Sequence, residues 1–349
     1  MKLLESLILG LSLASATAAA AVSQHLSAPA PFNSSHSEVI GTTTWHYLRA
    51  LPSVKYKGTV LLLHGFPDLP TGWSNQVPVF TSLGYQVIVP EMLGYGQTSS
   101  PCELSKFAFK AQSDSLAALM NKIVPGEQVI LGGHDWGAGL LWRFAMWHPS
   151  LFKAIFSIGF FFDPPVTEYV DLAVQIAAGN RSTFKYQLEF RDPSFDRPFE
   201  NETLLRQFLT AAYDGTTANG TRGFTPDGVN LDILPELQPS PLLNGTELEE
   251  HLAEIRRHSF RGPLNWYRLD KLNFEDELPI AQAGDVKFTQ PFLFIQPLRD
   301  PVLTPELSKG GDQFFTNLTR AEVDSRHWAL IEKPAEVNKE INSWLTTLE

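Results

Sequence analysis

A short stretch in the first half of the chain, residues 128–139, reads QVILGGHDWGAG and restricts the possible folds more than any other. An apolar run from Val129 to Leu131 leads into small residues around Asp135, and a helical pattern follows. This arrangement is typical of a strand that turns sharply into a helix and lifts one side chain above the sheet. The central position normally carries serine, and here it carries aspartate. Because aspartate is also a common helix N-cap, its role depends on partners elsewhere in the chain.

Other segments have the pattern of strands that are buried on both faces. They begin at Thr59, Tyr85, Leu151 and Phe292 and alternate with helical patterns. This alternation predicts an α/β fold with a mostly parallel sheet and helices on both faces. Residues 164–275 have helical pieces and polar loops instead, which predicts an α-helical cap inserted between two parts of one core, residues 40–163 and 276–349. Residues 27–37, rich in Ser, Pro and Ala, read as a flexible lead-in.

The amino terminus predicts secretion. Residues 1–20 combine Lys2, a short apolar stretch and small residues that suit cleavage of a signal peptide. Six N-x-[ST] sequons agree with this, and we expect a glycoprotein. The sequons are at Asn33, Asn180, Asn201, Asn219, Asn244 and Asn317. Cys102 is the only cysteine and reads as a buried thiol. The formal net charge of −11 argues against nucleic acid as a partner and makes membrane association unexpected.

Partners for Asp135 should follow the carboxyl ends of other strands, because catalytic side chains gather at that edge of a parallel sheet. Of the nine histidines, His327 follows the last expected strand. Asp300 ends the strand that begins at Phe292 and is the first candidate to orient His327. Asp163, which follows the preceding strand, is the second candidate.

The remaining histidines suit other roles. His64 and His134 flank the two Gly-rich turns, where they can orient the backbone, while His251 and His258 read as surface residues of a cap helix. Gly65 and Pro67 shape a tight turn after the strand that begins at Thr59. The backbone N–H of Phe66 in that turn, together with the N–H of Trp136, would form an oxyanion hole.

Taken together, these motifs resemble the epoxide hydrolases of the α/β-hydrolase fold. The resemblance rests on HGFP (64–67), GHDWG (133–137), Arg299-Asp300, Arg326-His327-Trp328 and two cap stretches, YQL with Phe190 and RGPLNWYR (261–268). It covers residues 40 to 345. The chain departs from the family at Arg326, where glycine is common before the histidine, and at Glu91, where aspartate is usual.

The resemblance implies a reaction and a set of roles. Asp135 would attack an epoxide and form an ester, while Tyr186 and Tyr267 protonate the ring oxygen. His327, oriented by Asp300, would then activate the water that releases a vicinal diol. Phe66 and Trp136 would also contact the substrate. A small hydrophobic epoxide and water would be the only partners, with no cofactor and no metal.

Two other functions remain open. A haloalkane dehalogenase uses the same aspartate nucleophile, but halide leaves without a proton, so that chemistry does not need paired phenols. A non-catalytic ligand-binding homologue would keep the fold and the pocket. An esterase is disfavoured, because aspartate in place of serine would form an unstable anhydride.

Overall fold

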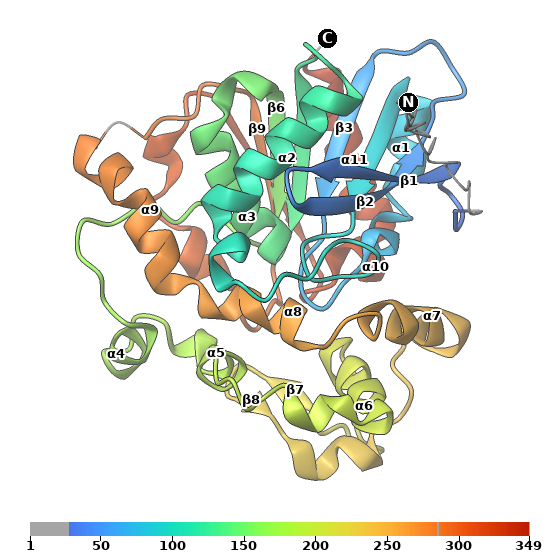
Figure 1. Cartoon of the computed structure of the whole chain (residues 1–349), viewed down its shortest axis with the longest axis vertical. Coiled ribbons are helices and arrows are strands. Elements are labelled where there is room, and N and C mark those ends of the chain that lie inside the picture. Colours follow the sequence, from blue (N-terminus) through green and yellow to red (C-terminus); the bar gives the residue numbers. More distant parts are fainter. Residues whose placement is uncertain (1–27, 285, 349) are drawn as a thin grey trace, which may run out of the picture.

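The computed structural model describes residues 28–284 and 286–348 and has an eight-stranded sheet at its centre (Figure 1). The strands are β1 (Ser34–Ile40), β2 (Thr43–Ala50), β3 (Gly58–Leu63), β4 (Tyr85–Pro90), β5 (Val129–His134), β6 (Phe152–Ile158), β9 (Phe292–Pro297) and β10 (Leu318–Val323). They lie in the order β1-β2-β4-β3-β5-β6-β9-β10. β2 pairs antiparallel with β1 and β4, and the other neighbours are parallel. The predicted mostly parallel α/β fold is confirmed.

The central strands are apolar throughout because both of their faces are covered. In β3, Leu61 and Leu63 pack toward α2 and α3, while Val60 and Leu62 pack toward α1 and α11. The core helices are α1 (Val77–Ser82), α2 (Phe109–Ile123), α3 (Trp136–Trp147), α10 (Ala329–Glu332) and α11 (Pro334–Thr346). Side chains alternate between the two faces of a strand, so an unbroken apolar run supplies both clusters at once.

The predicted flexible lead-in is wrong from Ser34 onward. β1 pairs residue for residue with β2, and Gly41 takes a φ of 59° in the turn between them. The sequence of β1, SSHSEVI, lacks the apolar run of a central strand because β1 is an edge strand with one side open; Val39 is 60% exposed. The sheet therefore begins before residue 40, the boundary expected for the core.

The segment between β6 and β9 contains no strand of the large sheet. Its elements are α4 (Leu172–Ala177), α5 (Tyr186–Phe190), α6 (Glu202–Ala212), β7 (Phe224–Thr225), β8 (Gly228–Val229), α7 (Gly245–Ile255), α8 (Arg261–Leu264) and α9 (Asp270–Ala283). Figure 1 shows α4 to α7 and the β7–β8 hairpin as a separate layer at one end of the sheet. α9 runs across residue 275, where the cap was expected to end, and leads back toward β9.

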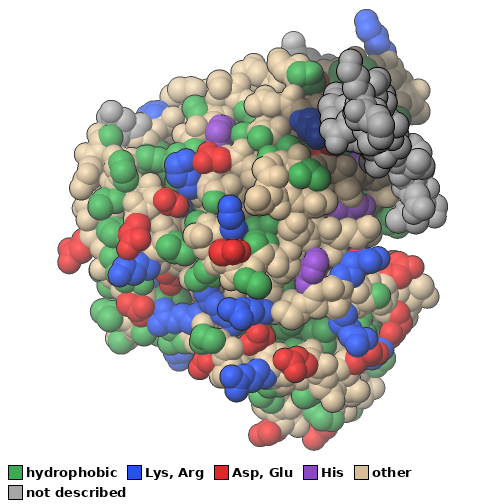
Figure 2. All heavy atoms as spheres, viewed as in Figure 1, with side chains coloured by type: hydrophobic (Ala, Val, Ile, Leu, Met, Phe, Trp, Pro, Cys, Tyr) green, Lys and Arg blue, Asp and Glu red, His purple; other side chains and the backbone are tan. Residues whose placement is uncertain are grey.

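The surface bears on several sequence predictions. On the face in Figure 2, acidic and basic side chains are interspersed. No helix among the described residues is long and apolar enough to cross a membrane. All six sequon asparagines are exposed. Residues 1–20, the expected signal peptide, lie outside the described residues. The prediction that Cys102 is buried is wrong: it is exposed in the polar loop after β4.

Candidate active site

Asp135 lies at the turn between β5 and α3. Its backbone has a φ of 53° and a ψ of −127°, which non-glycine residues rarely adopt. The glycines on either side allow the turn. A Cβ on Gly133 would lie 2.8 Å from the carbonyl oxygen of Gly137, and one on Gly137 would lie 2.3 Å from that of Leu63. The small residues in the sequence are therefore a steric requirement of this turn.

The carboxylate of Asp135 lies against the two backbone donors expected from the sequence. The N–H of Phe66 donates to Oδ1 at 2.7 Å, and the nearby N–H of Trp136 also lowers the pKa of the carboxyl. A Cβ on Gly65 would lie 2.4 Å from Oδ1, so glycine is needed for this close approach. Two backbone N–H groups beside one carboxylate can also stabilise an oxyanion that forms there.

His64 holds the turn that presents Phe66. Its Nε2 accepts the N–H of Met92 at 3.0 Å, so its Nδ1 carries the hydrogen and donates to the carbonyl of Gly65 at 3.0 Å. Burial lowers the pKa of His64 to about 3, which keeps the ring neutral. The prediction that His64 orients backbone is confirmed.

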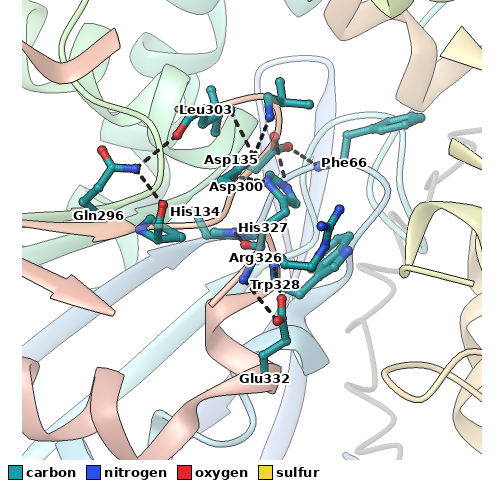
Figure 3. Close-up of polar contacts among 12 residues, drawn as sticks. Phe66, His134, Asp135, Gln296, Asp300, Leu303, Arg326, His327, Trp328 and Glu332 are labelled. Atoms are coloured by element: carbon teal, nitrogen blue, oxygen red, sulfur yellow. Dashed lines mark hydrogen bonds and ion pairs between the residues drawn. The ribbon is translucent and has the colours of Figure 1, made fainter. Parts of the chain in front are cut away.

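Asp300, His327 and Asp135 lie in a row at the carboxyl ends of the strands (Figure 3). His327 Nδ1 is 2.8 Å from Asp300 Oδ2, and its Nε2 is 3.6 Å from Asp135 Oδ2. The other oxygen of Asp300 accepts the N–H groups of Val302 at 2.8 Å and Leu303 at 3.0 Å, which fixes the carboxylate.

The second candidate acid, Asp163, lies elsewhere. Its carboxylate pairs with Arg181 at 2.7 Å and is 45% exposed. The structure therefore brings Asp300, and not Asp163, to the histidine.

Charge and burial set the protonation of this row. Burial would lower the pKa of His327, but the carboxylates of Asp300, Asp135 and Asp214 outweigh it and raise the pKa to about 9. Burial raises the pKa of Asp135, opposed by His327 and the two N–H donors. Burial would also raise the pKa of Asp300, but His327 and the N–H groups of Leu303 and Val302 lower it. These shifts favour an imidazolium at His327 beside the carboxylate of Asp300 at neutral pH.

Tyr186 and Tyr267 reach the same cavity from the cap. Tyr186 is the first residue of α5, Tyr267 lies in the 3-10 helix Asn265–Arg268, and their ring centroids are 5.8 Å apart. Both line the cavity that Asp135 and His327 line. Burial and the charge of Asp135 raise the pKa of Tyr186; burial, Tyr186 and Asp135 raise that of Tyr267. Both phenols therefore stay protonated and able to donate.

The other two cap tyrosines that could have taken this role face different partners. Tyr213 donates to Asp68 Oδ1 at 2.9 Å, and Tyr169 is 3.5 Å from Asp171 Oδ2.

Phe66 and Trp136 border different spaces. Phe66 lines the cavity above Asp135, and its ring packs edge-on against Tyr267 at 4.9 Å. Trp136 lines a neighbouring cavity of about 440 Å³, together with Trp266 and the buried Arg143–Glu277 ion pair. Trp136 also contacts the edge of Tyr267 at 5.1 Å, so it forms part of the wall between the two spaces.

Glu332, which the sequence patterns missed, and His134, which was expected to orient the backbone, support the loop of His327. Glu332, in α10, accepts the N–H groups of Arg326 and Trp328, each at 3.1 Å. His134 Nε2 lies 2.9 Å from the carbonyl oxygen of His327, and burial lowers the pKa of His134 to about 3, so the neutral ring donates there. Nothing in the helical pattern around Glu332 distinguishes it from a surface residue.

One histidine prediction is wrong. His251 is buried in α7 and contacts the carbonyl oxygen of Pro67 through Nε2. It was expected on the surface because helical spacing alone does not show which face of α7 meets the core. Among the described residues, no group of His, Cys, Asp and Glu side chains has the arrangement of a metal site.

Comparisons with known proteins agree with this geometry. Residues 58–334 match the family model described as alpha/beta hydrolase fold. An epoxide hydrolase of Neurospora crassa, srdG, is 38% identical, with 86% of this chain and 92% of that protein covered. Bifunctional epoxide hydrolase 2 of Rattus norvegicus is 30% identical over 82% of this chain, which spans only 51% of the rat protein.

Solved structures add a further comparison. Epoxide hydrolase A of Mycobacterium thermoresistibile superposes with a TM-score of 0.72 and 26% identity, with 90% of this chain and 98% of that chain covered. The chain belongs to the α/β-hydrolase-fold family and, within it, to the epoxide hydrolases.

Proposed function

We propose that this enzyme opens an epoxide by forming a covalent ester on Asp135 and then hydrolyses that ester with His327. The observation that carries the proposal is the environment of the Asp135 carboxylate. One carboxylate contacts two backbone N–H donors, lies 3.6 Å from a histidine nitrogen and shares its cavity with two protonated phenols.

In the first step, an oxygen of Asp135 attacks one carbon of the epoxide ring. The ring C–O bond breaks, its electron pair goes to the ring oxygen, and Tyr186 or Tyr267 gives that oxygen a proton. An ionised carboxylate needs no general base for this attack. The phenols lower the barrier, because alkoxide is a poor leaving group without a donor.

In the second step, water attacks Cγ of the Asp135 ester while His327 Nε2 takes one of its protons. The bond between Cγ and the substrate oxygen breaks, and the proton on His327 goes to the departing alkoxide, which leaves as a diol. Esterification removes the negative charge of Asp135, so the pKa of His327 falls from its resting value of about 9. The imidazolium proton then goes to the tyrosinate left by ring opening, which restores the phenol and leaves the ring available as a base. After the diol leaves, the new carboxyl of Asp135 gives its proton to His327, which restores the resting state. The N–H groups of Phe66 and Trp136 stabilise the oxyanion that forms on Cγ.

The decisive experiment is a single turnover in H₂¹⁸O with enzyme in excess over trans-stilbene oxide. The covalent route puts ¹⁸O into the Asp135 carboxylate and leaves the first diol unlabelled, because the diol oxygen comes from aspartate. Direct attack by water would label the diol instead and contradict the proposal. Asp135→Ala is the control, and it should form neither ester nor diol.

Substrate range separates the alternative functions. Purified enzyme would be incubated with styrene oxide, trans-stilbene oxide, an epoxy fatty acid and 1-bromobutane, with diol and bromide both measured. We expect diol and no bromide. Bromide without diol would identify a dehalogenase, and neither product would favour a binding role or a narrower substrate.

We also propose that the protein is secreted and N-glycosylated, on the basis of residues 1–20 and the six exposed sequon asparagines. Expression in a eukaryotic host with residues 1–349 intact should put the protein in the medium with a mass that falls on treatment with peptide N-glycosidase. Retention in the cell at the unmodified mass would contradict this.

A further inference from the structure

Three consecutive residues at the end of α6, Ala212 to Asp214, contact the two residues that flank His327. Trp328 Nε1 donates to the carbonyl of Ala212 at 2.8 Å, and its ring stacks on Tyr213 at 4.0 Å and 9°. On the other side, Arg326 Nε donates to Asp214 Oδ2 at 2.9 Å. We call residues 212–214 with Arg326 and Trp328 the cap clasp. His327 lies between the two points at which the clasp holds its loop.

The cap side of the clasp is itself fixed. Asp214 has a φ of 65°, an unfavourable backbone conformation for a residue other than glycine. Its second carboxylate oxygen pairs with Arg222, so two guanidinium groups hold one carboxylate. Tyr213 donates to Asp68, two residues beyond Phe66. The same cap segment therefore reaches both the histidine loop and the loop that presents an oxyanion donor.

The core and the cap hold the loop of residues 326–328 through different contacts. Glu332 and His134 hydrogen-bond to its backbone, at the N–H groups of residues 326 and 328 and the carbonyl of His327 (Figure 3). The ring of His134 also packs against the rings of His327 and Trp328. The clasp binds the side chains of Arg326 and Trp328. A glycine at position 326 would have no side chain that could reach the cap, so the contact with Asp214 depends on Arg326.

We propose that the clasp residues Ala212 to Asp214, through Arg326 and Trp328, are positioning residues for His327 and act on hydrolysis of the ester, but not on its formation. The proposal rests on the covalent mechanism above. Ester formation depends on Asp135, which its own turn holds, and on Tyr186 and Tyr267, which lie on other cap elements. Hydrolysis depends on His327, whose ring must direct Nε2 at a water beside Cγ of Asp135. A small displacement of such a group strongly reduces its rate contribution.

The charge of Asp214 supports the same assignment. Its carboxylate is one of the groups that raise the pKa of His327, after Asp300 and Asp135. Replacing it by a neutral side chain should therefore lower the pKa of His327 as well as loosen the loop.

The test separates the two half-reactions of Asp214→Asn, Arg326→Gly and Trp328→Phe by rapid mixing with trans-stilbene oxide. The Asp135 ester is quantified by mass spectrometry after acid quench. We expect ester formation within about twofold of wild type and ester decay slowed about tenfold, so that the ester accumulates. The double variant Asp214→Asn/Arg326→Gly should be no slower than the slower single variant, because both act through one contact.

The matched control is Asp171→Asn, which removes the Arg191–Asp171 ion pair, another partly exposed pair within the cap. It should change neither step.

A purely structural defect would not move the pH dependence of ester decay, whereas Asp214→Asn should shift the acid limb of that dependence to lower pH. Trp328→Phe removes the hydrogen bond to Ala212 but keeps an aromatic ring against Tyr213, so it tests the proposal even if Asp214→Asn and Arg326→Gly fail to fold. Urea unfolding of each variant shows whether it is folded.

The outcomes are distinguishable. If Asp214→Asn slows both steps equally, or leaves ester decay and its acid limb unchanged while wild type passes through the ester, the clasp proposal is overturned and the mechanism stands. If wild type makes diol with no ester on Asp135, the covalent mechanism fails and the clasp proposal fails with it.

Discussion

The turn that carries Asp135 and the loop of residues 326–328, which carries His327, are positioned in opposite ways. The backbone of Asp135 is held by its own neighbours in the sequence, through a strained turn and glycines that admit it, although its carboxylate also accepts the N–H of Phe66. The loop of His327 is held mostly by groups from distant parts of the chain, namely His134, Asp300 and the end of α6, together with the nearby Glu332. A turn fixed locally should fail as a whole when it is disturbed. A loop held by several separate contacts should lose its function by degrees.

The largest expected effect comes from Gly137→Ala. The new Cβ would lie 2.3 Å from a backbone carbonyl in the centre of the sheet, so the turn cannot form without shifting β3. We expect a loss of about 3 kcal/mol in the free energy of unfolding and loss of both half-reactions. Urea unfolding monitored by tryptophan fluorescence measures the first.

Gly139→Ala is the comparison for that variant, since its Cβ would meet only side-chain rings, those of Trp136 at 3.3 Å and Phe109 at 3.8 Å. It should change the free energy of unfolding by less than about 1 kcal/mol. Equal effects of the two substitutions would refute the steric account of the turn.

His327→Gln should leave the first half-reaction working and stop the second. We expect steady-state diol formation to fall by about 10³-fold or more, with a stoichiometric ester trapped on Asp135. Intact-protein mass spectrometry after mixing with epoxide detects the trapped species. Loss of ester formation as well would mean that His327 also acts in ring opening. The assignment of ester formation to the Asp135 turn and of ester hydrolysis to the His327 loop would then be incorrect.

Tyr267→Phe tests the phenol donors of the cap, which belong neither to the Asp135 turn nor to the His327 loop. Removing one of two hydrogen-bond donors to the developing alkoxide should slow ester formation by about 10²-fold, while decay of the preformed ester stays near the wild-type rate. Tyr169→Phe, whose hydroxyl lies by Asp171, should leave both rates unchanged. A slower decay in Tyr267→Phe would place the phenol in the hydrolysis step too.

The last expected effect is a dependence of stability on pH. The pKa of His327 is raised to about 9 in the folded protein, from about 6.5 in an unfolded chain. Its protonation therefore stabilises the fold fully below pH 6.5, and this contribution disappears as the pH rises through 9. The free energy of unfolding of wild type minus that of His327→Gln should decrease between pH 6 and pH 9.5. A constant difference would contradict the raised pKa.

The same contrast explains what could be predicted from the sequence. The strand-turn-helix around Asp135 leaves a local signature, so its turn and its N–H donors were predictable, as was the parallel core that surrounds them. β1 was missed because an edge strand does not need an apolar run. Asp214 was missed because its partner Arg326 lies 112 residues away in the sequence, and a contact at that separation imposes no spacing on the residues around it. His251 was misplaced for the same reason, since its contact, the carbonyl of Pro67, is 184 residues away. Glu332 lies close to Arg326 and Trp328 in the sequence, but it was missed because it binds their backbone N–H groups, and such contacts leave no pattern of residue types.

The insertion of the cap between β6 and β9 also governs the order in which the site is assembled on the ribosome. Phe66 and Asp135 precede the cap, Tyr186 and Tyr267 lie within it, and Asp300 and His327 follow it. Since domains begin to fold from the N-terminal side during synthesis, Asp135 is made long before His327. Under the mechanism proposed above, a nascent chain can form the turn around Asp135 but cannot release product until β9 and β10 complete the sheet and bring in Asp300 and His327.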